Sequence, residues 1–164
     1  MYMNWLIGCT VVLLLLGCER QVNNSVTLVY QGAQCGTTEP SMVWLSTEKE
    51  LIEIFNKASG TSITLPQNES QVQYTDTMPK MELDKYYYIY VSSGMQPSAG
   101  YQIVASGNTF NIVKSVAQLP IELKKPQPGT MQAMMTTVPC AIIEIDKGNF
   151  KVVDAMGIQL TRIP

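Results

Sequence analysis

The stretch YYYIYVSSG, residues 86–94, decides the fold of this chain. Aromatic and β-branched residues fill it, and such residues are enriched in strands because they suit a pleated, largely buried surface. We therefore predict a central β-strand here that ends at Gly94. Further strand patterns lie on both sides of it, at VTLVYQG (26–32), MVWL (42–45) and AIIEID (141–146).

Two hairpins are expected from turn signals between neighbouring strands. GYQIVAS (100–106) and TFNIVKSVA (109–117) flank Gly107-Asn108, a dipeptide suited to a tight turn. AIIEID (141–146) and FKVV (150–153) flank the turn sequence KGN in the same way. In each case we predict that the two strands pair with each other. A last strand is expected at IQLTRI, near the end of the chain.

One segment has the pattern of a helix, at about residues 47–59. Thr47 followed three residues later by Glu50 fits a capping box, and Leu51, Ile54 and Phe55 fall on one face. The fold class that follows is α+β tending to mainly β. We expect an antiparallel sheet or sandwich with one packed helix, formed by a single globular domain over residues 26–164.

The N-terminus has the pattern of a lipoprotein signal peptide, residues 1–17. Its apolar run from Val11 to Leu16 is too short for a membrane-spanning helix, which needs about 20 apolar residues. The sequence LLGC that ends at Cys18 resembles the bacterial lipobox. That resemblance implies that Cys18 becomes the mature N-terminus and carries lipid, including acyl chains such as palmitate. Residues 18–25 would then be a lipidated tether.

The lipid would anchor the protein in the bacterial cell envelope, because several acyl chains together bind a membrane stably. Glu19, rather than Asp, follows the cysteine, which by the enterobacterial sorting habit implies the outer membrane. The net charge is −2, from eleven Lys and Arg against thirteen Asp and Glu. Such a balance gives no electrostatic footprint for nucleic acid.

Cys35 and Cys140 remain as a pair once Cys9 is removed and Cys18 is lipidated. In an oxidising envelope they are expected to form a disulfide that links the first strand region to one of the last. Two buried free thiols are the alternative, and a reducing compartment would favour it. The sequence leaves both open.

Catalytic and metal-binding patterns are missing from the sequence. There is no histidine, which removes the usual Ser-His-Asp and Cys-His systems and the commonest metal ligand. Ser46 to Lys49 has the S-x-x-K spacing of penicillin-binding enzymes, but a helix start explains the same residues. Glu144 and Asp146 should share the solvent face of their strand, with Ile143 and Ile145 inward. We expect no enzymatic activity, no cofactor, no metal and no small-molecule substrate.

Residues 81–104, MELDKYYYIYVSSGMQPSAGYQIV, resemble the C-terminal domain of the protease complex subunit PrcB family. The resemblance lies in an acidic entry, an apolar strand and a Pro-containing turn before Gly-Tyr. It extends to KKPQPGT and TTVPCAIIEI, and the PrcB-like region covers about residues 42–154. It implies a non-enzymatic subunit of a surface protease complex. The matching residues are Asp84, Gly94, Pro97, Gly100 and Tyr101, and the similar downstream segment contains Thr137 and Pro139, with Cys140 where the family often has an aromatic residue.

The turn Met95–Tyr101 also resembles the Pro-Gly loop of chagasin-like cysteine-protease inhibitors. Proline and glycine hold such a loop rigid at low entropic cost, so that it can occupy a cleft. A partner-binding loop at Gln96, Pro97, Ser98, Gly100 and Tyr101 is therefore predicted, and the expected partner is a protein such as a protease. Gln96 and Ser98 would form the tip, Gly100 would need a positive φ, and Tyr101 would pack inward.

Three functional hypotheses remain open from the sequence. The first is a protein-interaction subunit that associates with or stabilises an envelope protease complex. The second is a protease inhibitor that uses the Met95–Tyr101 loop, and the third is an envelope lipoprotein with a structural role. If the loop is a plain turn, the methionines of MQAMM, residues 131–135, are the next candidate surface.

Overall fold

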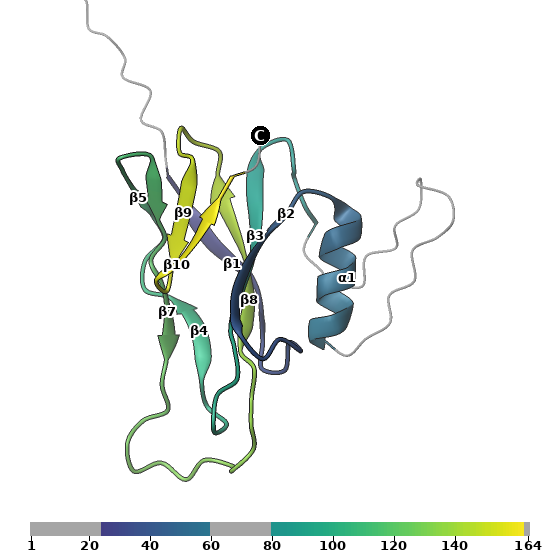
Figure 1. The fold of residues 1–164 in the computed structure, drawn as a ribbon, viewed down its shortest axis with the longest axis vertical. Helices are drawn as coiled ribbons and strands as arrows, with labels where there is room; N and C mark the ends of the chain where they lie inside the picture. Colours follow the sequence, from purple (N-terminus) through teal and green to yellow (C-terminus); the bar gives the residue numbers. More distant parts are fainter. Residues whose placement is uncertain (1–23, 60–79, 163–164) are drawn as a thin grey trace, which may run out of the picture.

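The computed structural model describes residues 24–59 and 80–162 (Figure 1). Within these residues the chain forms ten strands and one helix. Their order and bounds are β1 (Val26–Gly32), β2 (Pro40–Leu45), α1 (Glu48–Ser59), β3 (Tyr86–Ser93), β4 (Gln102–Ala105), β5 (Asn111–Val113), β6 (Val116–Gln118), β7 (Ile121–Lys124), β8 (Cys140–Asp146), β9 (Val152–Ala155) and β10 (Ile158–Thr161). The mainly β fold with one helix is as predicted.

The strands form three layers together with the helix. The first sheet has the strand order β1-β8-β3-β2 and is antiparallel throughout. A second sheet, β10-β9-β6-β5, and the two-stranded pair β4-β7 cover one face of it. Helix α1 covers the opposite face, as Figure 1 shows. The first sheet is thus buried on both sides.

Burial on both sides explains the continuous apolar run of β8. Ala141, Ile143 and Ile145 point into the core between the sheets, whereas Cys140 and Ile142 point toward the helix. All five are at most 1 % exposed. A strand that is solvated on one face would alternate apolar and polar residues instead.

The prediction for Glu144 and Asp146 is therefore wrong in one respect. Both do lie on the face opposite Ile143 and Ile145, but both are half-buried rather than open to solvent. Glu144 is half-buried and accepts a hydrogen bond from the Tyr88 hydroxyl. Two-sided burial of the sheet is a tertiary property, which alternation along a single strand does not reveal.

The helix begins with the predicted capping box. The Thr47 hydroxyl oxygen accepts a hydrogen bond from the Glu50 N–H, and the Glu50 carboxylate accepts one from the Thr47 N–H, both at 3.2 Å. Each side chain thereby satisfies a backbone donor that the first turn leaves unpaired. The Ser46 N–H donates to the same carboxylate at 2.7 Å. Ser46 to Lys49 therefore form the start of a helix, which is the explanation that we preferred for their S-x-x-K spacing.

Both predicted hairpins are wrong. Strand β4 pairs with β7, and the residues after Gly107-Asn108 form a separate short hairpin, β5-β6. Strand β8 pairs with β1 and β3, whereas β9 pairs with β10 and, in parallel, with β6. Burial on the sheet faces selects other partners for these strands than the turn signals suggested.

The hairpins that do form turn at residues with positive φ. Lys114 and Ser115, at φ 50° and 65°, join β5 to β6, and Met156 and Gly157, at 54° and 77°, join β9 to β10. Two consecutive positive φ values are those of a type I′ turn, which matches the twist of the flanking strands. The dipeptide Met156-Gly157 lies between two strand patterns, so the sequence contained a signal for the β9-β10 hairpin.

The described chain begins inside the domain. Ser25 donates its N–H to the Asp146 carboxylate at 2.7 Å, and the Asn24 carbonyl accepts from the Phe110 N–H. These two residues, assigned above to the tether, therefore belong to the fold. Cys18, the predicted lipidation residue, and the predicted signal peptide lie outside the described residues. Among residues 24–59 and 80–162, no helix combines the length and apolar character needed to cross a bilayer.

Candidate partner-binding surface

The loop Met95–Tyr101 connects β3 to β4 and is held at its base by two other segments. The Met95 N–H donates to the Thr38 carbonyl at 2.9 Å. Gln96 and Thr137 exchange two backbone hydrogen bonds, at 2.7 and 3.0 Å, and form an antiparallel bridge. The Thr137 hydroxyl donates to the Ser98 carbonyl. The loop is therefore a fixed turn between strands.

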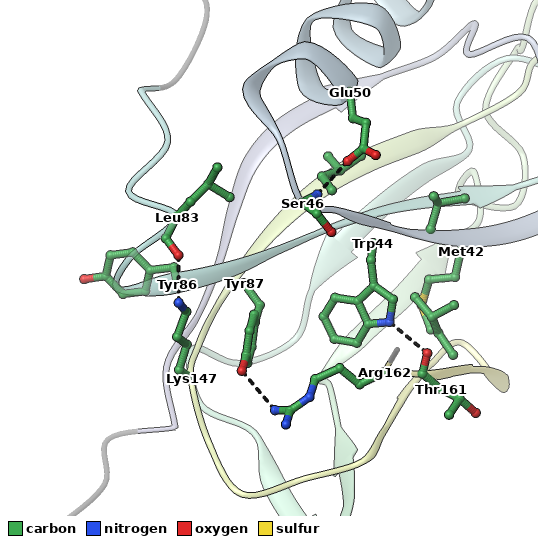
Figure 2. Close-up of a pocket in the computed structure, with 13 residues that line it drawn as sticks. Met42, Trp44, Ser46, Glu50, Leu83, Tyr86, Tyr87, Lys147, Thr161 and Arg162 are labelled. Atoms are coloured by element: carbon green, nitrogen blue, oxygen red, sulfur yellow. Dashed lines mark hydrogen bonds between the residues drawn. The ribbon is translucent and has the colours of Figure 1, made fainter. Parts of the chain in front are cut away.

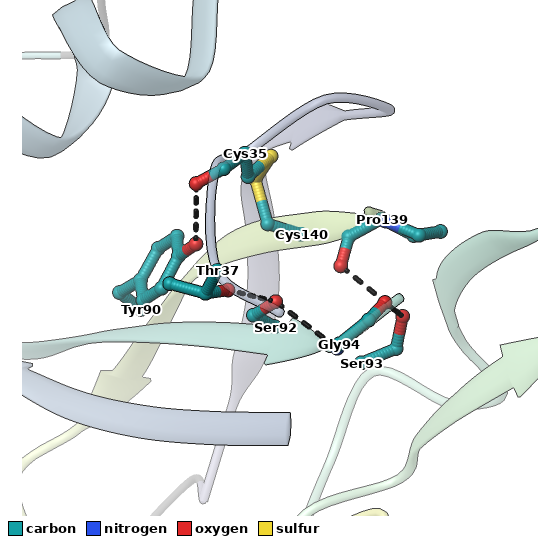
Figure 3. The surroundings of a disulfide bond; sticks show 8 residues. All are labelled: Cys35, Thr37, Tyr90, Ser92, Ser93, Gly94, Pro139 and Cys140. Atoms are coloured by element: carbon teal, nitrogen blue, oxygen red, sulfur yellow. Dashed lines mark hydrogen bonds between the residues drawn. A yellow bond between two sulfur atoms is a disulfide. The ribbon is translucent and has the colours of Figure 1, made fainter. Parts of the chain in front are cut away.

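A disulfide joins the two segments that hold this loop. Cys35 and Cys140 are bonded, as expected for an oxidising compartment, with 5.9 Å between their Cα atoms. The Cys35 N–H donates to the Val138 carbonyl, and the Val138 N–H donates to the Ala33 carbonyl. The bond thus fastens residues 33–38 to residues 137–140, and Figure 3 shows it beside the end of β3 that leads into the loop.

Buried polar groups complete the support beside the disulfide. Figure 3 shows Ser92 and Ser93 at the end of β3, where both are less than 10 % exposed. The Ser92 hydroxyl oxygen accepts from the Gly94 N–H and from the Thr37 hydroxyl. Gly94 has φ +71°, and a Cβ added there would lie 2.7 Å from the Pro40 nitrogen. Only glycine fits this position without a backbone shift.

The predicted loop residues divide into exposed and supporting ones. Pro97 and Gly100 are exposed, whereas Ser98 and Tyr101 are half-buried. Gly100 has the expected positive φ, +91°, and a Cβ there would contact the end of the Gln132 side chain. Gln96 is not a free tip residue, because its amide donates to the Ser93 carbonyl at 3.2 Å. Met95, which was not singled out, is 55 % exposed.

Four exposed methionines form what we call the methionine surface: Met95 in the loop, and Met131, Met134 and Met135 in the segment beside it. Met131 and Met134 are fully exposed, and Met135 is 51 % exposed. Ala133, between them, accepts a hydrogen bond from the Ala99 N–H, so this segment lies against the loop. The loop and residues 131–135 were alternative candidates from the sequence, but the hydrogen bond between Ala99 and Ala133 places them side by side.

A cleft at the opposite end of the first sheet was missed by the sequence analysis (Figure 2). Trp44, Tyr87, Lys147 and Arg162 line it, and they come from four separate segments of the chain. No short motif contains them, so no sequence pattern could have grouped them. Across residues 24–59 and 80–162, no group of His, Cys, Asp or Glu has the arrangement of a metal site.

Comparison with known proteins gives one match. The family model described as PrcB C-terminal matches residues 87–146, from β3 to β8, a shorter region than the predicted 42–154. No curated protein and no solved structure matches the chain. The matched region includes the loop Met95–Tyr101, the methionines at 131–135 and Cys140. Residues 87–146 therefore match the PrcB family C-terminal domain, which confirms the resemblance found in the sequence.

Proposed function

We propose that this protein is a non-enzymatic, lipid-anchored subunit of an envelope protease complex, and that it binds its protein partner through the methionine surface and the loop Met95–Tyr101. The family match supports association with a protease complex. The observation that carries the choice of surface is the exposure of four methionines in and beside a loop fixed by a disulfide.

Methionine side chains suit such a role. They are unbranched and polarisable, so they adapt to the shape of a partner, and exposed apolar surface on a soluble domain marks interaction sites. The rigid base beneath the loop lowers the entropy that binding would otherwise cost, because the backbone is ordered before the partner arrives. An exposed surface on a fixed base is a feature of preorganised interfaces.

The position of this surface is compatible with a lipid anchor. The described chain starts beside Phe110 and Asp146, at one end of β1, whereas Gly32 at the other end pairs with Cys140. Figure 1 shows the loop between β7 and β8 at the end of the molecule opposite the start of β1. With lipid on Cys18 in the outer membrane, the methionine surface would face away from the bilayer.

The test is affinity purification of the full chain from detergent-solubilised envelopes of its host, with protease activity as the readout. The wild-type chain should recover an active protease. The double variant Met131→Gln and Met134→Gln should recover at least tenfold less, with an unchanged melting temperature. Val113→Gln is the matched control, because Val113 is also exposed, at 48 %, but lies on β5.

Two results would contradict the proposal. Equal recovery of activity by the double variant would show that the methionine surface is not the interface. A protease that co-purifies but is inactive, and regains activity on dissociation, would favour the inhibitor hypothesis.

A further inference from the structure

The cleft in Figure 2 lies where the edges of two sheets approach each other. It has a volume of about 620 Å³, within the usual range for ligand pockets. Strand β2 forms one wall, and Leu160 to Arg162, at the end of β10, form part of another. Three of its principal side chains, Trp44, Lys147 and Arg162, lie outside the segment that matches the PrcB family.

Tyr87 stands at the centre of this cleft with two cations beside its ring. The Arg162 guanidinium carbon lies 5.4 Å from the ring centroid, and the Lys147 Nζ lies 5.3 Å from it. Arg162 also donates to the Tyr87 hydroxyl oxygen at 2.9 Å. The Trp44 ring meets Tyr87 edge to face at 5.7 Å. Aromatic faces hold both positive charges at the cleft.

Neither cation is neutralised by a carboxylate among the residues that the structure describes. The two ion pairs there join Lys49 to Glu53 and Lys85 to Glu82. Lys147 donates to the Leu83 carbonyl, which carries no net charge. Glu50 also lines the cleft, but its carboxylate accepts the N–H groups at the helix start. The cleft therefore has unpaired positive charge beside apolar walls.

Both strands at the cleft are the last in their sheets. Strand β2 ends the order β1-β8-β3-β2, and β10 ends the order β10-β9-β6-β5. Over the described part of the chain, no backbone hydrogen bond connects β2 with β10, although the Trp44 side chain donates to the Thr161 carbonyl. Because β10 lies close beside β2, an extended peptide would occupy the cleft that the two strands line rather than insert between them as an additional strand.

We propose that this cleft binds an extended segment of a protein partner that carries an acidic side chain. The segment lies in the cleft against β2 and residues 160–162, and its carboxylate accepts hydrogen bonds from Arg162 and Lys147. Met42, Trp44 and Leu160 form an apolar wall. In the bound segment, the side chains next to the acidic residue pack against this wall. The site goes beyond the proposed function, because it uses other elements than the methionine surface and lies at the opposite end of the sheet.

The test measures Trp44 fluorescence in the full chain in detergent micelles. Trp5→Phe leaves Trp44 as the sole tryptophan of the chain. The probes are acetyl-Thr-Val-Glu-Val-Thr-amide, the same peptide with Gln in place of Glu, and the Gln peptide with a free carboxyl terminus. We expect the capped Glu peptide to bind about tenfold more tightly than the capped Gln peptide, as charge-assisted hydrogen bonds predict. Added salt should reduce this preference.

Variants test whether Lys147 and Arg162 cause the preference for the Glu peptide. Lys147→Met and Arg162→Met should each reduce the affinity for the Glu peptide toward that for the Gln peptide. Arg162→Lys should retain part of the difference between the two affinities. Lys124→Met is the matched control, because Lys124 is an exposed cation on β7. Lys147 is exposed, so its replacement should leave the melting temperature unchanged and keep the test valid if Arg162→Met is unstable.

Three results would overturn the proposal: equal binding of the capped Glu and Gln peptides, a preference retained in Lys147→Met and Arg162→Met, or tighter binding of the Gln peptide with the free carboxyl terminus. The last would assign the site to a chain terminus instead of an acidic side chain. None of these results bears on protease recovery through the methionine surface, so the two proposals can fail separately.

Discussion

Tyr88 on β3 donates its hydroxyl hydrogen to the carboxylate of Glu144 on β8, with 2.6 Å between the two oxygens. The two residues are direct partners in the antiparallel register, and the Tyr88 oxygen also accepts the Glu82 N–H at 3.0 Å. Burial, and secondarily this hydrogen bond to a carboxylate, raise the pKa of Tyr88 well above its usual range. The pair thus fixes the register of the central strands on the helix side.

The first prediction concerns stability in alkali. Because the pKa of Tyr88 is higher in the folded than in the unfolded state, the unfolded chain loses this proton first, near pH 10. The stability that the shift contributes is fully present below pH 10 and is lost as the pH rises through the folded-state pKa. The free energy of unfolding should therefore fall between about pH 10 and about pH 11.5.

Urea titrations across that range would check this prediction. Tyr88→Phe should show a smaller decrease than the wild type, and Glu144→Gln an intermediate one, because burial persists without the carboxylate. Some decrease should remain in both variants, since burial also raises the pKa of Tyr30. The same pH dependence in Tyr88→Phe as in the wild type would contradict the assignment.

The second prediction concerns the disulfide between Cys35 and Cys140. Replacing both residues by alanine should lower the free energy of unfolding by about 2–5 kcal/mol, the typical effect of losing a native disulfide. Amide exchange at Met95 and Gln96 should accelerate more than exchange at Ile89, because the bond lies beside the end of β3 that leads into the loop. Reductant should lower the free energy of unfolding of the wild type and leave that of the double variant unchanged. Uniform acceleration at all three amides would argue against a local role.

The third prediction compares two glycines with similar backbone angles. Gly94 and Gly129 have φ +71° and +80°, so alanine at either position should cost about 1–2 kcal/mol from the left-handed conformation. Gly94→Ala should cost at least about 1 kcal/mol more, because its Cβ would meet the Pro40 backbone, whereas Gly129 has nothing within 4 Å. Equal losses of unfolding free energy would show that the contact relaxes freely.

The fourth prediction concerns the anchor at Cys18. The wild-type chain should incorporate a clickable palmitate analogue in a bacterial host, and Cys18→Ser should not, because the lipid is attached through that thiol. Cys9→Ser is the matched control and should be labelled normally. Undiminished labelling of Cys18→Ser would refute the lipoprotein assignment.

Local sequence determined the features that depend on neighbouring residues. The bounds of β1, the start of α1 and the positive φ of Gly100 followed from alternation, a capping box and turn chemistry. Each depends on interactions within a few residues, which a sequence window contains. The PrcB resemblance was also readable, because its turn residues lie close together along the chain.

Strand partners and the cleft were decided by the tertiary structure alone. Strand β8 reads as one half of a hairpin, yet it lies between β1 and β3, because only there are Ile142 and Ile143 buried on opposite faces. Burial on a face depends on what covers it, and that is set by the whole chain. The charges at Tyr87 likewise meet through folding, since Lys147, just after β8, and Arg162, just after β10, lie far from Tyr87 in the sequence.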